Sequence, residues 1–127
     1  MTSQQLIPSI LGSVKKNLNI PDEVDVFDPD LLMHINTTLA KLNQMGIGPE
    51  EPLMVEDSSA TWDELCTGKL DAMVRSYVFL EVRLLFDPPT ASVLTSYEKK
   101  RDELEWRLNV ADDDLLYAGE DDTDDID

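Results

Sequence analysis

The side chains best suited to chemistry are few in this chain and lie without obvious partners. His34 is the only histidine and Cys66 is the only cysteine. A lone histidine between apolar positions is typical of the edge of a core, and a single cysteine can build neither an internal disulfide nor a zinc site. Ser58 and Ser59 fall in an expected loop, and no sequence pattern around them indicates a serine–histidine–aspartate catalytic triad. The residues therefore predict no catalytic group, no metal centre and no cofactor.

Acidic side chains are the other chemically distinctive group. The formal net charge is −17, and nine of the 27 acids fall in residues 111–127, which contain no base. These acids lack the alternating spacing and closing glutamate of an EF-hand loop, so we expect weak cation binding at most. The glycines of "GIG" (46–48) lack the spacing and the lysine of a phosphate-binding loop and predict a turn.

The charge pattern also divides the chain. Residues 1–110 keep 18 acids against ten bases and form the expected helical domain. Residues 111–127 form an acidic tail, which we expect to be flexible because its charges repel and it has little to bury. Neither part should attract a phosphate backbone. No apolar run is long enough to cross a membrane, and the absence of a secretory signal pattern favours an intracellular location.

Helical periodicity predicts the elements that position these residues. A one-turn helix with a capping box is expected at Thr61, and a short extended piece is expected over 53–57. Asp28 is expected to cap a helix whose first turn contains Pro29, and Gly46 to end that helix. The four main helical segments are 3–18, 28–45, 70–86 and 91–109.

A sharp corner joins the last two segments. Segment 70–86 is apolar nearly all round and should be buried on more than one side, whereas segment 91–109 has one apolar stripe and one charged face. Asp87, Pro88 and Pro89 cannot continue the first helix, and Thr90 can cap the second. We interpret the corner as architecture and expect an all-α bundle of about four helices that ends in a long antiparallel pair.

Several stretches together resemble a known family. They are "ILGSVKKNLNI", "DPDLLMHINTTLAKLNQMGIGP", "TWDEL", "VRSYVFLEVRLLFDPPT" and "LEWRLNV". Over about residues 5–110 the chain resembles the head–tail connector proteins of long-tailed bacteriophages (siphophages), also called head-completion or adaptor proteins. The resemblance implies a virion component made in the host cytoplasm. It also implies a ring, usually of twelve copies, that binds the portal, extends the DNA channel without specific DNA binding, and docks a stopper or tail-completion protein.

Two alternatives remain open beside this interpretation. The chain could be an acidic DNA mimic that inhibits a nucleic-acid-binding enzyme, or, much less favoured, a metal- or nucleotide-dependent enzyme. The apolar island "LLYAG" (115–119) in the tail could order on the portal, or the tail could serve solubility alone. The candidate subunit or portal contacts are Glu98, Lys99, Arg101, Glu105, Trp106, Arg107, Leu115, Leu116 and Tyr117.

Overall fold

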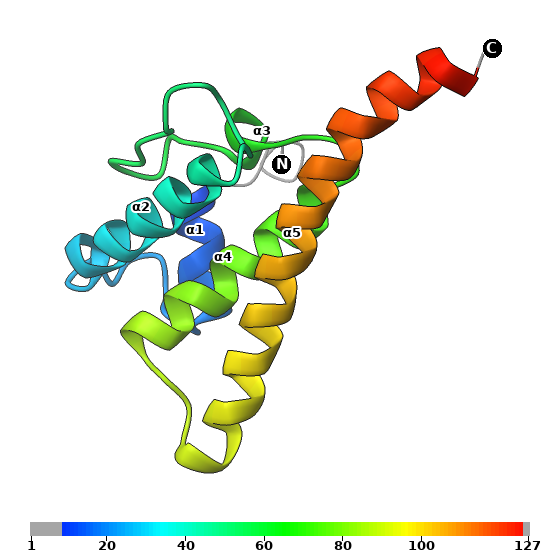
Figure 1. Cartoon of the computed structure of the whole chain (residues 1–127). Helices are drawn as coiled ribbons and strands as arrows, with labels where there is room; N and C mark the ends of the chain where they lie inside the picture. The colour runs from blue at the N-terminus through cyan, green and yellow to red at the C-terminus, as the bar shows by residue number, and fades with distance from the viewer. Residues whose placement is uncertain (1–8, 126–127) are drawn as a thin grey trace.

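The computed structural model describes the backbone of residues 9–125 and the side chains of residues 9–111 (Figure 1). Over this part of the chain no strand occurs, and the nearest approach to one is an isolated bridge between Ser9 and Thr61. The prediction of a small all-α bundle is therefore confirmed. The helices are α1 (Ile10–Asn17), α2 (Asp28–Gln44), α3 (Trp62–Leu65), α4 (Asp71–Phe86) and α5 (Ala91–Asp125).

Helix α1 begins where a serine can cap it. The Ser9 hydroxyl accepts a hydrogen bond from the Gly12 N–H group at 2.7 Å, which satisfies one donor of the first turn. The helix ends at Asn17 with Leu18 as its C-cap, and the next residue, Asn19, has a left-handed φ of 63°. The expected helical residues 3–8 lie outside the described part of the chain.

Helix α2 starts at the expected residue, but without the expected capping hydrogen bond. Pro29 lies in the first turn, where its missing N–H group costs little. Asp28 is already helical and makes no capping hydrogen bond, so the prediction that it caps α2 is wrong. Its carboxylate instead contacts Lys15 Nζ of α1 at 3.0 Å, which shows that a tertiary ion pair replaced the local cap. At the other end, Gly46 has a φ of 89° and terminates the helix as predicted.

The loop between α2 and α3 is held by side chains rather than by a sheet. Val55 donates its N–H group to Asn36 Oδ1 at 2.8 Å and accepts from Asn36 Nδ2 at 3.0 Å. An amide side chain thus satisfies the backbone that we expected to be extended. In the one-turn helix α3, the Thr61 N–H group donates to the Glu64 carboxylate at 3.1 Å, as in the predicted capping box.

Helix α4 lies at the centre of the bundle and contacts α1, α2 and α5 (Figure 1). Its residues Val74, Tyr77, Val78 and Val82 have no exposed surface. Each such side chain contributes roughly 1.5–3 kcal/mol of transfer free energy. This enclosure confirms the expectation that segment 70–86 is buried on more than one side. Trp62 of α3 closes one end of the same core.

The corner Asp87–Pro88–Pro89 separates α4 from α5. Arg83 Nε donates to the Asp87 carbonyl at 3.1 Å, and the Thr90 carbonyl accepts the N–H groups of Val93 and Leu94 in the first turn of α5. From the corner, contacts between the two helices run in opposite order along the chain. They join Arg83 to Tyr97, Glu81 to Arg101 and Tyr77 to Glu105.

Helix α5 is longer than the sequence suggested. We expected it to end near Asn109, but the described backbone stays helical to Asp125. In Figure 1 its last turns extend past the other helices. The proposed division at residue 110 and the flexibility of the tail stay predictions, because side chains beyond Ala111 lie outside the described residues.

Candidate interaction surfaces

A buried carboxylate joins three helices at the centre of the bundle. Glu81 of α4 is 3% exposed. It accepts hydrogen bonds from Lys41 Nζ of α2 at 2.8 Å and from Arg101 of α5 at 2.8 Å. A buried charge is tolerated only when it is paired and hydrogen-bonded, and both requirements are met here. We call Glu81, Lys41 and Arg101 the three-helix clamp.

The contacts of the clamp shift the pKa values of Glu81 and Arg101. Burial alone would raise the pKa of Glu81, but hydrogen bonds from Lys41 and Arg101, and their charges, outweigh it and place this pKa below its ordinary value. The pKa of Arg101 is raised, chiefly by its hydrogen bond to Glu81. Glu81 and Arg101 are therefore both charged at neutral pH.

A second polar contact between α4 and α5 lies one helical turn away from the clamp. The Tyr77 hydroxyl donates to Glu105 Oε2 at 2.7 Å, and Lys41 Nζ lies 3.7 Å from the same oxygen atom. Burial, and then this hydrogen bond, raise the pKa of Tyr77. Arg101 and Glu105 were expected to face other subunits, but both are partly buried and make contacts inside the bundle. The sequence signal for the clamp was the single acid within the most apolar stretch of α4.

Other predicted contacts on α5 do face outward. Glu98 and Lys99 are exposed. Trp106 is 65% exposed, so it does not pack inside the bundle. Arg107 is exposed and pairs with Glu103 one turn earlier at 2.9 Å. Whether these four residues contact other subunits stays a prediction. Leu115, Leu116 and Tyr117 have backbone atoms in α5, but their side chains lie outside the described residues.

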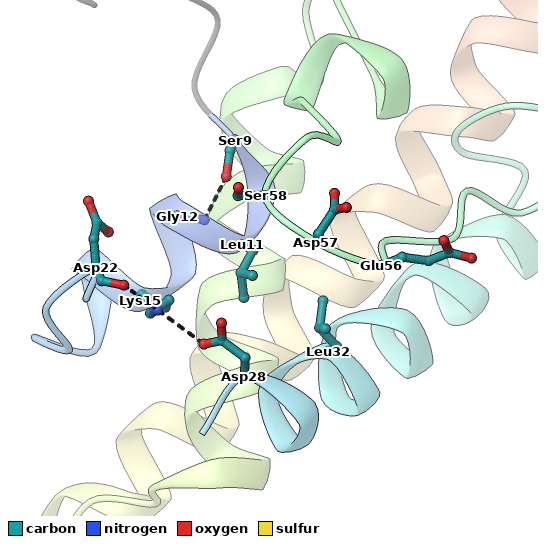
Figure 2. A pocket seen from close by; sticks show the side chains of 10 residues that line it. All are labelled: Ser9, Leu11, Gly12, Lys15, Asp22, Asp28, Leu32, Glu56, Asp57 and Ser58. Atoms are coloured by element: carbon teal, nitrogen blue, oxygen red, sulfur yellow. Dashed lines mark hydrogen bonds and ion pairs between the residues drawn. The ribbon is translucent and has the colours of Figure 1, made fainter. Parts of the chain in front are cut away.

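A cavity of about 570 Å³ lies between α1, the start of α2 and the loop before α3 (Figure 2). Lys15 is one of the residues that line it, with a side chain that is 5% exposed. Its Nζ atom donates to the Asp22 carbonyl and lies 3.0 Å from Asp28 Oδ1, as the dashed lines in Figure 2 show. Glu56 and Asp57 on the facing loop add negative charge to the rim.

A second hollow, of about 700 Å³, runs between α4 and α5 next to the end of α1. We call it the α4–α5 groove. Its apolar surface comes from partly buried side chains, and two bases reach its rim. The residues lining the groove are Asn17, Ser76, Phe79, Leu80, Arg83, Ser96, Tyr97, Lys100 and Leu104.

The lone histidine and the lone cysteine are both partly buried. His34 lies half-buried, with its ring 6.4 Å from that of Phe86 in an edge-on arrangement. Burial, together with the charge of Asp71, raises the pKa of the Cys66 thiol, which disfavours the nucleophilic thiolate.

Among the residues that the structure describes, no three His, Cys, Asp or Glu side chains are grouped to hold a metal ion. No helix in that part of the chain has the length and apolar character to cross a membrane.

Comparison with known proteins identifies one relationship. The family model described as "Phage connector protein" matches residues 10–114. This span begins with α1 and includes α2, α3, α4 and most of α5. No match was found among curated proteins or among solved structures.

Proposed function

The chain belongs to the phage connector proteins, and from this premise we propose that it forms a ring on the portal at the capsid vertex. The family gives the chain a structural role in the head–tail connection of a virion. In the proposal, copies of the chain extend the DNA channel below the portal and present a docking surface to a stopper or tail-completion protein. The ring is proposed to hold twelve copies and to assemble in the host cytoplasm.

The observation that carries this proposal is the family match over residues 10–114. The physical character of the bundle supports it. A connector must transmit force between head and tail without deforming, and the three-helix clamp ties α2, α4 and α5 together at one point. Polar networks of this kind, when fully satisfied, favour one packing arrangement over others.

Ring closure requires two different surfaces on each copy. A head-to-tail contact that repeats with a fixed rotation closes into a ring, so the two sides of each subunit must be complementary. The outward face of α5 offers one such surface, because it combines the exposed charges of Glu98 and Lys99 with the exposed indole of Trp106. Tryptophan is enriched among the residues that dominate interface energies.

The acidic composition suits a channel through which DNA must slide. A cationic lining would bind phosphates and release counterions, which would slow passage. With a formal charge of −17 the chain offers few bases for such binding. We propose that the channel lining is acidic or neutral. A strongly basic lumen in the assembled ring would contradict this part of the proposal.

The decisive experiment mixes the purified chain with its cognate portal protein and images the complex by electron microscopy. We expect a ring of density, coaxial with the portal, on the face that lies outside the capsid. A matched sample in which an unrelated acidic protein replaces the chain controls for nonspecific adhesion. Portal particles without added density, at chain concentrations well above those of the portal, would refute the proposed role.

The charge of −17 favours one other candidate, an acidic inhibitor that imitates DNA. A third of the acids, however, lie in residues 111–127, outside most of the helical bundle. Removal of those residues distinguishes the two functions. A mimic would lose its inhibition of a nucleic-acid-binding enzyme, whereas a connector has no such inhibition to lose and would keep the fold of its helical bundle.

A further inference from the structure

The α4–α5 groove combines apolar and basic groups in an otherwise acidic protein. Phe79, Leu80, Tyr97 and Leu104 give it an apolar surface, and each of these side chains is only partly buried. Arg83 and Lys100 lie at its rim, and the described residues that line it include no acid. The chain has 27 acids and ten bases, so this surface departs strongly from the average composition.

The two rim bases are available to a partner. Lys100 is exposed and forms no ion pair with any described side chain. Arg83 donates to a backbone carbonyl, and its guanidinium lies 5.8 Å from the centre of the Tyr97 ring. A fitting occupant therefore has a short apolar stretch for the floor and carboxylates beside it for the rim.

The chain itself contains a segment of this composition. Residues 112–125, "DDDLLYAGEDDTDD", hold eight acids and no base around the apolar island Leu115–Gly119. We call these residues the C-terminal segment. Its pattern of acid, apolar island and acid is complementary to the base-rimmed apolar groove.

A copy of the chain cannot fill its own groove with this segment while α5 stays helical. Lys100 and Leu115 lie on the same continuous helix, Ala91–Asp125. At 1.5 Å per residue they are separated by about 22 Å along its axis. In Figure 1 the last turns of α5 extend away from the part of the helix that packs against α4. Occupation of the groove by the segment therefore requires two copies.

We propose that the C-terminal segment of one copy docks in the α4–α5 groove of a second copy. The groove and the segment are different surfaces, so the contact is head-to-tail and its repetition can close a ring. The inference rests on the proposed function, because it supplies the contact between neighbouring subunits of that ring. The apolar island would lie against the aromatic floor, and the flanking acids would face Arg83 and Lys100.

Photo-crosslinking in the full-length chain tests this contact directly. The photoreactive residue p-benzoylphenylalanine replaces Tyr117, and isotopically heavy and light chains are mixed, assembled on the cognate portal and irradiated. We expect peptides that join position 117 of a heavy chain to Phe79, Leu80 or Tyr97 of a light chain. Cross-links to the portal alone, cross-links within a single copy, or an absence of cross-links to the groove would each overturn the proposal.

A pair of charge-reversal variants tests the role of the rim. Lys100→Glu places an acid at the groove, whereas Lys69→Glu makes the same change at another exposed lysine that does not line it. We expect Lys100→Glu to lower the yield of heavy–light cross-links by about fivefold and Lys69→Glu to leave it unchanged. Equal yields in the two variants would contradict the charge argument.

The same samples separate failure of this contact from failure of the proposed function. Co-sedimentation with the portal reports whether the chain binds the portal at all. If the chain does not co-sediment, the proposed function fails, and the cross-linking is repeated on the concentrated free chain. Heavy–light cross-links to the groove there would still support the contact between copies, and their absence would reject it.

Discussion

At Glu81 the fold places a carboxylate in the most apolar helix and surrounds it with two cations. The sequence shows the acid but not its partners, because Lys41 and Arg101 lie 40 residues before it and 20 residues after it. Arg101 and Glu105 were therefore assigned to an outer surface by their helical spacing alone. Periodicity places a residue on a face of a helix, and only the packing of neighbouring helices decides whether that face is solvated.

The clamp makes Glu81→Gln a destabilising substitution. The change removes the charge that holds Lys41 and Arg101, and we expect a loss of about 2–3 kcal/mol in the free energy of unfolding. This is less than for a fully buried pair, because both cations keep some access to water. Urea denaturation at pH 7 measures it. Glu98→Gln, at an exposed position, is the control and should change the value by less than about 0.5 kcal/mol.

The stability difference between the wild type and Glu81→Gln should depend on pH in a specific way. The pKa of Glu81 in the folded state lies below its ordinary value of 4.5, so its stabilisation is present above the unfolded pKa and disappears as pH falls through the folded pKa. The stability difference between wild type and Glu81→Gln should stay constant from about pH 7 to 5 and shrink below about 4.5. Urea midpoints at a series of pH values measure this difference. A difference that grew on acidification would exclude the assigned charge state.

At the scale of elements, the sequence predicted helices well and their ends less well. Gly46 ends α2 because glycine adopts a left-handed conformation at little cost, and the corner residues end α4 because proline disfavours the helical conformation of the residue before it. Asp28 and the end of α5 were assigned wrongly for different reasons. A capping aspartate can be recruited by a distant lysine. Residues 110–125 contain no proline, the one residue type whose ring clashes with a helix interior, so nothing in them forces the helix to stop.

The acid-rich end of α5 should be a marginal helix. Aspartates near a helix C-terminus oppose the helix dipole, and like charges on successive turns repel. Raising the salt from about 0.01 M to about 1 M shortens the Debye length from about 30 Å to about 3 Å. We therefore expect the helical content of residues 112–125 to rise with salt, as measured by NMR Cα chemical shifts. Residues 94–108, which pack on α4, provide the internal control and should not respond.

At the scale of the whole molecule, the sequence predicted a structural protein for two reasons. It shows no recognisable set of catalytic or metal-binding residues, and it resembles the connector proteins. The family match supports that class. The α4–α5 groove escaped prediction, because it is formed by residues of three helices whose relative register depends on side-chain packing. Trp106 illustrates the same limit. Its position near the end of the charged face fitted either a buried or an exposed indole, and the structure shows it 65% exposed.

Because Trp106 is exposed, its substitution should affect assembly without affecting the stability of the bundle. Trp106→Ala removes a side chain that contributes little to the core, so the free energy of unfolding should change by less than about 0.5 kcal/mol. If the outward face of α5 meets a neighbouring subunit or the portal, loss of the indole should weaken assembly on the portal about tenfold or more. Val93→Ala truncates another exposed apolar side chain of α5, 39% exposed, and is the matched control. Binding titrations read by sedimentation compare the two variants. An unchanged affinity for Trp106→Ala would show that this face points to solvent in the assembled virion, and the contacts that close the ring would then have to come from elsewhere on the bundle.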